Sequence, residues 1–387
     1  DGASYIAGTT DGALAGQALS GASDALLAKY DSNGSLQWVR LLGGTNAAEA
    51  KGACTDPFGG IYIAGKTDGI FDGHALLGSV QGFLAKYDAA GTLQWSRTMG
   101  GTISAEFRGC ATDAVGHVYA LGVARGTIRG YATVGFEDLL LAKYDRFGNE
   151  ILAAHFGEVS RTMNPLAISF DGTNLQVAGS VNGSVAGQVF LGNLSDGLWQ
   201  RYSPMGAVLA TKLIGVAGGD TELYGAQSGT DANTYLAGTT TGNLDGELHS
   251  GNGVYDVFFT SYDSFGTRRF TKLIGGPSSV VALKGLALDS SDNACLAGLA
   301  NGPINGVSPG GTASAFMISF SSAGSIRYTK FAQGDPAGAS AFFGVAADAA
   351  GNCYGAGYVQ GAELAGVPLA GLIDAVLVKY DANGDNK

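Results

Sequence analysis

Hydrophobic and polar residues alternate in short runs along the whole chain, and these runs predict strands. In one stretch, residues 106–113 are small and apolar, 118–122 contain β-branched and aromatic residues, 138–144 are apolar, and 150–156 alternate. Each run has the length of a strand and is bounded by Gly, Asp or Asn. Turns such as Y-D-S-N-G and Y-D-R-F-G separate the third run from the fourth, and glycine there is typical of tight hairpins. The stretch therefore predicts four antiparallel strands.

The same four-run pattern occurs seven times along the chain. An aromatic residue that ends the third run marks each copy: Tyr30, Tyr87, Tyr144, Tyr202, Tyr262, Phe320 and Tyr380. Successive markers differ by 57, 57, 58, 60, 58 and 60 positions, or (380 − 30)/6, about 58. A near-fixed period means that each repeat is one supersecondary unit. The pattern predicts an all-β fold, a seven-bladed β-propeller of four-stranded antiparallel blades forming one domain over residues 1–387, whereas a β-solenoid would use a shorter period.

The composition of the strands predicts their order within a blade. The first runs, such as K-G-A-C-T-D at 51–56 and R-G-C-A-T-D at 108–113, are rich in Gly and Ala, which suits strands that crowd around a central axis. The fourth runs, such as L-Q-W-V-R at 36–40, alternate bulky apolar and polar residues, as expected of an outer strand with one wet face. We expect the chain to run from the innermost strand of each blade to the outermost.

The chain begins just before a second strand and ends at Lys387, after the turn that follows a third strand. The terminal blades are therefore expected to be incomplete, lacking one innermost and one outermost strand. Three explanations remain open. The sequence could be a segment of a longer chain, a terminus could be mobile, or a neighbouring molecule could donate the strands through open blade edges and so build a polymer.

Several words of the repeat carry a family resemblance. The pattern Y-I-A-G, D-A-L-L-A-K-Y-D-x-N-G and L-Q-W-x-R-x-x-G-G resembles the bacterial β-propeller repeat called SBBP, and more distantly the NHL repeat. The likeness covers the chain and is strong in the first three copies. The fourth and sixth copies depart from it, with Arg201 or Ser319 at the place of Lys29, and Ser203 or Ser321 at the place of the following Asp. The resemblance implies a secreted or surface-exposed bacterial propeller and supplies no catalytic residues.

The composition of the chain bears on its possible partners and on its location in the cell. Glycine accounts for 64 of 387 residues, well above the ~7% that is typical, and the tight corners of the blades explain the excess. The net charge is −11 with dispersed Lys and Arg, which argues against nucleic acid because phosphate recognition needs clustered cations. No apolar run approaches a membrane span and no signal peptide opens the chain. We expect an extracellular or cell-surface protein.

The four cysteines are Cys54, Cys110, Cys295 and Cys353. Cys54 and Cys110 lie in first strands of neighbouring blades, one register position apart, and Cys295 and Cys353 lie in second strands with the same offset. Such an offset should point the side chains of each pair to opposite faces. We therefore expect four free, buried thiols rather than a disulfide framework.

The longest connection in each blade joins the second strand to the third. All seven have a G-x-x-x-G-like core, whose second glycines are Gly16, Gly73, Gly130, Gly187, Gly246, Gly306 and Gly366. These loops should share one rim, where binding usually resides. Their sevenfold likeness favours a structural turn instead, because a unique site normally breaks a repeat. The binding candidates on these loops are Asp11, Gly16, Asp68, Asp72, Gly73, His74, Asp245, Gly246 and His249.

Other chemistry receives little support. Residues 380–385, Y-D-A-N-G-D, come closest to a calcium loop, but no Glu follows at the EF-hand spacing, so a hairpin turn is favoured. The histidines His74, His117, His155 and His249 lack zinc-site spacing, and the glycine-rich words end strands and open no helix, which disfavours a phosphate loop. We expect no metal and no cofactor. Four aromatic residues are candidates either to bind sugar or protein at a rim or to cover the blade core: Phe58, Phe71, Tyr131 and Phe136.

The sequence thus predicts a propeller that acts without catalysis as an interaction or structural module, with a protein or carbohydrate partner at the cell exterior. The first alternative is a subunit of a filament or surface layer that shares blade strands between molecules. The second is an enzyme acting on polysaccharides at an axial funnel. Fold alone does not choose among these.

Overall fold

The computed structural model describes residues 2–251, 255–277, 279–332, 338–364, 367–369 and 371–387. All regular structure in these residues is β-strand, which confirms the all-β prediction. The chain divides into two compact units: Asp1–Leu175 with Arg201–Ala210, and Gln176–Gln200 with Thr211–Lys387. The expectation of a single domain stays a prediction.

Three sheets belong to the first unit. The first runs β1 (Ser4–Thr10), β2 (Asp24–Tyr30) and β3 (Leu36–Leu42). The second runs β4 (Ala48–Thr55), β5 (Ile61–Thr67), β6 (Gln81–Tyr87) and β7 (Leu93–Met99). The third runs β8 (Ser104–Thr112), β9 (Val118–Arg125), β12 (Asp138–Tyr144) and β13 (Glu150–Phe156), with a small hairpin, β10 (Thr127–Ile128) and β11 (Tyr131–Ala132), in its long loop.

The division between the units falls inside the fourth sheet, β14 (Met163–Phe170), β15 (Leu175–Val181), β16 (Asp196–Tyr202) and β17 (Val208–Ile214). Three sheets follow in the second unit. The fifth is β18 (Thr221–Ser228), β19 (Thr234–Thr240), β20 (Asp256–Tyr262) and β21 (Arg268–Ile274), and the sixth is β22 (Val281–Leu288), β23 (Ala294–Ala300), β24 (Ser314–Phe320) and β25 (Ile326–Phe331). The seventh is β26 (Ala339–Ala347), β27 (Cys353–Gln360) and β30 (Ile373–Tyr380), with the loop hairpin β28 (Glu363–Leu364) and β29 (Val367–Pro368).

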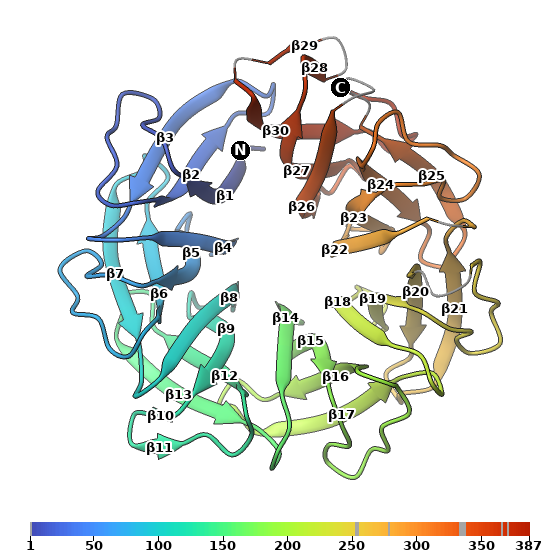
Figure 1. Cartoon of the computed structure of the whole chain (residues 1–387), viewed down its shortest axis with the longest axis horizontal. Coiled ribbons are helices and arrows are strands. Elements are labelled where there is room, and N and C mark those ends of the chain that lie inside the picture. Colours follow the sequence, from blue (N-terminus) through green and yellow to red (C-terminus); the bar gives the residue numbers. More distant parts are fainter. Residues whose placement is uncertain (1, 252–254, 278, 333–337, 365–366, 370) are drawn as a thin grey trace. The chain divides into compact units, whose positions relative to one another are not determined.

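These seven antiparallel sheets are the blades of a seven-bladed β-propeller, numbered here in chain order (Figure 1). The predicted runs match the strands closely: 138–144 and 150–156 coincide with β12 and β13. The first and last blades have three strands, as the repeat count predicts.

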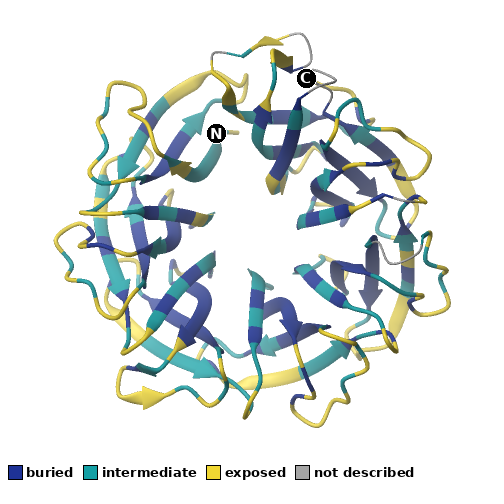
Figure 2. Ribbon diagram, viewed as in Figure 1, coloured by how far each residue is buried: buried dark blue, intermediate teal, exposed yellow. Residues whose placement is uncertain are grey.

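The strands of a blade differ in burial, which follows from their composition. The third strands of blades 1–6 are buried along most of their length, and every residue of β12 and of β20 is buried, whereas β30 of blade 7 is partly exposed (Figure 2). The fourth strands are exposed near their starts, as at Leu36 and Val208, and are more buried further along. The apolar third runs therefore form the middle of each blade, and the alternating fourth runs form an edge with one wet face.

The first strands of neighbouring blades lie against each other within each unit, as the small residues predict. In the first unit, a Cβ placed on Gly52 of β4 would lie 2.9 Å from the Cα of Gly109 in β8. In the second, a Cβ on Gly285 of β22 would lie 2.9 Å from a methyl of Val345 in β26. No real Cβ tolerates such a distance from backbone, so Gly52 is required by the approach of β8.

A repeated contact fastens blade 1 to blade 2 and blade 2 to blade 3. The indole Nε1 of Trp95 in β7 donates to the backbone oxygen of Arg146 at 3.2 Å, and the guanidinium of Arg97 donates to the oxygen of Gly148 at 2.7 Å. Trp38 and Arg40 of β3 make the same bonds to the hairpin of blade 2. The Trp95 ring lies so close to Gly148 that a Cβ there would be 2.9 Å from it. The repeated W-x-R word therefore clamps neighbouring hairpins together.

The prediction of four free thiols is wrong, because the structure has two disulfides, Cys54–Cys110 and Cys295–Cys353. Cys54 pairs across its blade with Tyr62, whereas Cys110 pairs with Ala120, one position beyond the equivalent of Tyr62. The two side chains do point to opposite sheet faces. Stacked blades, however, bring opposite faces together, so the offset joins the sulfurs instead of separating them.

Both disulfides link neighbouring blades within one unit. Cys54–Cys110 joins β4 to β8 across a Cα distance of 5.7 Å, and Cys295–Cys353 joins β23 to β27 across 5.8 Å. Both values lie within the range that unstrained backbone allows. Within the described residues, no helix is long and apolar enough to cross a membrane.

Candidate functional site

The long loops between second and third strands contain the predicted binding residues, and each described loop turns in the same way. In blade 2, the backbone groups of Phe71 and His74 bond to each other at 3.1 and 2.8 Å across Asp72 and Gly73. Asp72 has a φ of 46° and Gly73 a φ of 79°. Two successive positive φ values define a type I′ turn, which glycine adopts without strain. The turn explains why the glycine is repeated.

The equivalent turns place a non-glycine residue at positive φ before each glycine. The pairs are Ala15–Gly16, Asp72–Gly73, Arg129–Gly130, Ala186–Gly187, Asp245–Gly246 and Asn305–Gly306. The seventh predicted glycine, Gly366, lies outside the described residues. Gly16, Gly73 and Gly246 thus have a structural reason to be glycine, while the binding role predicted for their loops stays a prediction.

In blade 2, Asp72 and His74 meet at a buried serine of the outer strand. The Ser96 hydroxyl of β7 donates to Asp72 Oδ2 at 2.6 Å, and His74 Nε2 lies 3.1 Å from the Ser96 hydroxyl oxygen. The hydroxyl proton is committed to Asp72, so Nε2 must be the donor to Ser96. A catalytic triad has the reverse order, since there the carboxylate orients the imidazole and the imidazole accepts from the serine. The cluster attaches the loop to β7.

Asp68 and Asp11 lie apart from this cluster. Asp68 exchanges two bonds with Ala47 in the connection between β3 and β4: its Oδ1 accepts from the Ala47 amide at 2.9 Å, and its own amide donates to the Ala47 oxygen at 3.2 Å. Asp11 and Gly16 are exposed on the blade 1 loop. That loop is attached by Gln17, whose amide donates to the Val39 oxygen at 2.7 Å and accepts from the Leu41 amide at 3.2 Å.

Asp245 in blade 5 is also attached to the outer strand of its own blade. The Thr271 hydroxyl donates to Asp245 Oδ2 at 2.6 Å, and Arg268 forms an ion pair with the same carboxylate. His249 is nearly buried and lies beside Asp256, with 3.8 Å between Nε2 and Oδ1. The structure thus places the nine predicted residues in separate clusters on blades 1, 2 and 5, joining Asp72 with His74 and leaving Asp11 alone.

A set of buried carboxylates at the start of the third strands was missed by the sequence analysis. Asp138 of β12 accepts from the amides of Val134 and Gly135, both at 2.8 Å, and lies 2.9 Å from His155 Nδ1. Asp24, Asp196 and Asp256 occupy the same place, and burial raises the pKa of Asp196. The signal was present in the sequence, because the repeated word D-A-L-L-A-K-Y begins with this residue.

The aromatic candidates divide into buried and exposed residues. Phe71 is fully buried and stacks on Phe83 with 4.4 Å between ring centroids, so it covers the blade core. Phe58, Tyr131 and Phe136 are 61%, 70% and 67% exposed. These three are available for contact with a partner.

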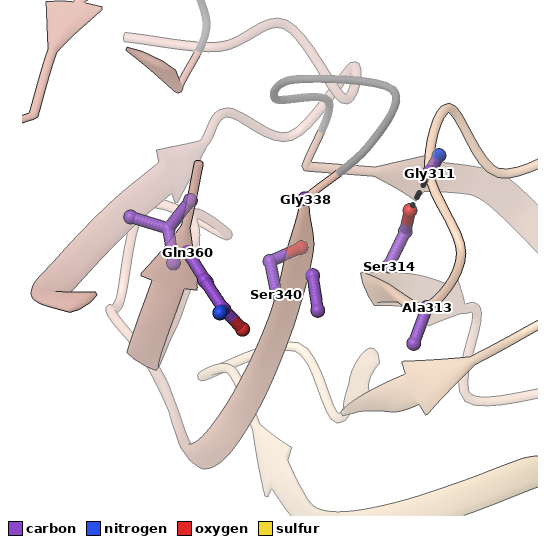
Figure 3. A pocket seen from close by; sticks show the side chains of 8 residues that line it. Gly311, Ala313, Ser314, Gly338, Ser340 and Gln360 are labelled. Carbon is purple, nitrogen blue, oxygen red and sulfur yellow. Dashed lines mark hydrogen bonds between the residues drawn. The ribbon is translucent and has the colours of Figure 1, made fainter. Parts of the chain in front are cut away.

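Figure 3 shows a depression beside β26, lined by Gly311, Ser314, Gly338, Ser340 and Gln360 among others. It encloses about 180 Å³ including open solvent, whereas ligand pockets usually have ~300–1,000 Å³. The Gly311 amide donates to the Ser314 hydroxyl at 3.2 Å. The residues that line it carry no charge.

The hairpin that most resembled a calcium loop uses its carboxylate internally. Asp381 Oδ1 accepts from the amides of Asn383 and Asp385, both at 2.9 Å, and Oδ2 pairs with Lys387 at 3.0 Å. These donors lower the pKa of Asp381 to about 2, the Asp385 amide foremost. Among the residues that the structure describes, no three His, Cys, Asp or Glu gather in an arrangement that could hold a metal ion.

These features define the class of protein: a repeat-built, seven-bladed β-propeller whose long loops are tied to the outer strands of their own blades. Comparison with known proteins identifies the repeat. Residues 37–72 match SBBP, described as a β-propeller repeat, which confirms the resemblance in this part of the chain.

The chain is also similar to one curated protein over part of its length and to several solved structures. It is 29% identical over 133 residues to regulatory protein FlaEY of Caulobacter vibrioides, which covers 32% of this chain and 14% of FlaEY. Among solved structures, a puromycin hydrolase mutant matches over 100% of this chain and 51% of its own, with a TM-score of 0.55 and 9% identity. The polysaccharide lyase Uly1 matches over 93% and 85%, with a TM-score of 0.48 and 9% identity. At such identities the likeness concerns the fold alone.

Proposed function

We propose that this propeller is a non-catalytic interaction or scaffold module at the cell exterior, which holds a protein or carbohydrate partner on its loops. The observation that carries the proposal is the exposed apolar patch on the blade 3 loop, defined by Tyr131, Val134 and Phe136, which are 70%, 52% and 67% exposed. Exposed aromatic side chains gathered on one loop are a common mark of an interaction site.

The blade 3 loop turns like the other described long loops, with one further backbone pair, Thr127 with Ala132. The Phe136 amide donates to the oxygen of Arg161 at 2.8 Å, a bond that the Ser79 amide also makes in blade 2. What sets this loop apart is that two of its exposed apolar residues, Tyr131 and Phe136, are aromatic. The loop backbone is thus fixed while its aromatic rings are left to solvent. A rigid presentation of apolar side chains favours binding, because little conformational entropy is lost when a partner docks.

The engagement of the polar loop residues also supports a binding role over a catalytic one. A general base or nucleophile needs a free lone pair or an activated proton. Asp72 accepts the Ser96 hydroxyl proton, His74 donates its Nε2 proton to Ser96, and Asp245 uses its carboxylate on Thr271 and Arg268. The two disulfides support export, because such bonds persist in oxidising compartments.

A double substitution, Tyr131→Ser with Phe136→Ser, tests the proposal. The purified chain would be applied to arrays of glycans and of extracellular proteins, while release of reducing ends and absorbance at the wavelength of unsaturated uronates report catalysis. We expect binding without turnover, and loss of binding in the double variant. Leu248→Ser is the matched control, since Leu248 is 79% exposed on the blade 5 loop. Turnover that the heat-inactivated chain lacks would contradict a non-catalytic role.

A filament or surface-layer subunit, in which blade strands are shared between molecules, is the second candidate function. Light scattering of the purified chain decides between the two candidates: concentration-dependent polymers would favour shared strands, and monomers would not.

A further inference from the structure

A cluster of one arginine and two phenylalanines lies at the hairpin ends of blades 2 and 3, opposite the long loops. Phe58 belongs to the hairpin between β4 and β5, and Arg146 and Phe147 belong to the hairpin between β12 and β13. The Arg146 guanidinium carbon lies 4.8 Å from the Phe147 ring centroid and 5.6 Å from that of Phe58. The two rings are 64% and 61% exposed. These three residues form the hairpin-tip cluster.

The fold itself does not need these side chains. The matching hairpin of blade 2 has Ala89 and Ala90 at the positions of Arg146 and Phe147. Its Asp88 accepts from the amides of Ala90 and Thr92 at 3.0 and 2.9 Å, and Asp145 of blade 3 accepts from the amides of Phe147 and Asn149 at 2.8 and 2.9 Å. The Trp95 clamp reaches only the backbone oxygen of Arg146. Two alanines would therefore make the same turn and keep the same clamp.

The Arg146 guanidinium is also free of an acidic partner. In the described part of the chain no carboxylate pairs with it, whereas Arg125 and Arg129 of the same blade pair with Glu137 and Glu150 at 3.1 and 2.7 Å. The nearest acid in sequence, Asp145, is bonded to its own hairpin. The aromatic faces hold the planar fork in place without using its N–H donors, which suits bidentate recognition of an oxyanion.

We propose that the hairpin-tip cluster binds an acidic polysaccharide, with the carboxylate of a uronate sugar on the fork of Arg146. The apolar faces of the sugar rings pack on Phe58 and Phe147. Arginine and carboxylate match in geometry and form short, charge-assisted hydrogen bonds. Exposed rings on either side of the charge supply the contact area that a carboxylate alone would lack.

The size of the cluster favours a sugar chain over a protein. Two phenylalanines offer at most about 300–500 Å² of contact, while a stable protein partner covers about 800 Å² per side. A polysaccharide repeats its unit, so one small site can be rebound many times along the polymer. The net charge of −11 opposes a polyanion only at long range, because salt at ~0.15 M screens charges beyond ~8 Å.

This inference rests on the proposed binding role but concerns the other end of the blades. The variants Tyr131→Ser and Phe136→Ser, made for the long-loop patch, should leave uronate binding unchanged. Failure of one proposal is therefore distinguishable from failure of the other.

The test is calorimetric titration with oligogalacturonate and with its methyl ester, which has the same rings without the charge. The key variant is Arg146→Ala with Phe147→Ala, which gives blade 3 the natural hairpin residues of blade 2. We expect the acid to bind and the ester to bind at least about tenfold more weakly. The double variant should lose at least about tenfold in affinity for the acid, and Arg146→Lys should fall between, because lysine keeps the charge and loses the fork.

Control measurements distinguish a loss of the binding site from a loss of the fold. Phe265→Ala removes a ring that is 92% exposed on the corresponding hairpin of blade 5, where Ser264 stands in place of Arg146, and it should leave binding unchanged. Unaltered thermal melting would show that the double variant is folded. Equal binding of acid and ester, absence of binding, or undiminished binding by the double variant would each overturn the proposal. Equal affinity for poly-glutamate would assign the cluster to acidic peptides instead.

Discussion

The two ends of a blade are fastened by different means. At the long-loop end, the backbone turn repeats but the side chains that attach it differ: Gln17 bonds to the backbone of β3, Asp72 and His74 to Ser96, and Asp245 to Thr271. At the hairpin end, blades 1 and 2 use the same attaching side chain, Trp38 or Trp95, on a backbone oxygen of the next hairpin.

The bonding partner explains the difference between the Trp attachments and the loop attachments of blades 2 and 5. A backbone oxygen is present in every blade, so a side chain that bonds to it can stay the same. Asp72 and Asp245 bond to side chains, and such pairs can change together from blade to blade. Gln17 also bonds to backbone, but blade 2 has His74 at this place and attaches its loop through Ser96 instead. A partner is to be sought at side chains that neither repeat nor form a hydrogen bond or ion pair within the described part of the chain, such as the side chains of Arg146 and Tyr131.

Removing the buried carboxylate of blade 3 should have the largest effect on stability. Asp138→Ala takes away the acceptor of the Val134 and Gly135 amides and the partner of His155. Unpaired buried donors cost their full desolvation free energy, so we expect a loss of about 3 kcal/mol. Urea unfolding and faster hydrogen exchange at the two amides would measure it. Asp11→Ala, at an exposed position, should change stability by less than about 0.5 kcal/mol.

Removing the hairpin clamp should have the second largest effect on stability. Trp95 packs beside Tyr62 and Tyr144, with 5.8 and 6.3 Å between ring centroids, and bonds to the Arg146 oxygen. Trp95→Ala should cost about 2–3 kcal/mol in unfolding free energy, since the ring is only partly buried. Trp95→Leu should lower the unfolding free energy by less. Blade 3 naturally has Leu152 at this place, and Leu152 packs beside Gly206 as Trp95 packs beside Gly148. If both variants unfolded at the same urea concentration, the ring would not be the clamp.

Repetition explains how much of this fold was predictable. Strand positions follow from seven copies of one pattern, and the crowding of first strands follows from glycines such as Gly52. The disulfides were missed because the offset of Cys54 and Cys110 was judged within one sheet, where opposite faces separate side chains. Between stacked blades the same offset brings them together.

The candidate site was harder to predict, because its contacts are between residues distant in sequence. Asp72 and His74 share a loop, but Ser96, which binds both, lies more than 20 positions away, at the variable position of the L-Q-W-x-R word. Phe58 and Arg146 are on different blades. Periodicity identifies what every blade shares, and it says nothing about contacts that occur once.

A smaller, pH-dependent effect is expected at the first hairpin of blade 2. Burial alone would raise the pKa of Asp56, but hydrogen bonds from the Gly60 amide, Tyr62 and Lys86 outweigh it and lower the pKa. A lowered pKa in the folded state contributes stability that is present above the unfolded value of ~3.9 and is lost as the pH falls through the folded value.

Asp56→Asn should therefore be less stable than the wild type at pH 7, by on the order of 1 kcal/mol, and this difference should narrow as the pH falls through the lowered folded pKa of Asp56. Urea midpoints of both proteins from pH 7 into acid would measure the difference. Tyr62→Phe, which removes the hydroxyl 2.8 Å from Asp56 Oδ2, should reduce the pH dependence without abolishing it. If the difference in stability between the wild type and Asp56→Asn persisted unchanged in acid, its cause would be packing and not the charge of Asp56.

The smallest effect on stability is expected at the blade 1 loop, where one side chain forms two hydrogen bonds with the backbone of the outer strand. Gln17 offers both a donor and an acceptor to the edge of β3, through the Val39 oxygen and the Leu41 amide. Gln17→Ala should cost about 1 kcal/mol in urea unfolding. Gln17→Glu should cost more at pH 7, because a carboxylate accepts from Leu41 but repels the Val39 oxygen. If Glu were as stable as Gln, the loop would be held by its turn, and the long-loop end would need no side-chain attachment in this blade.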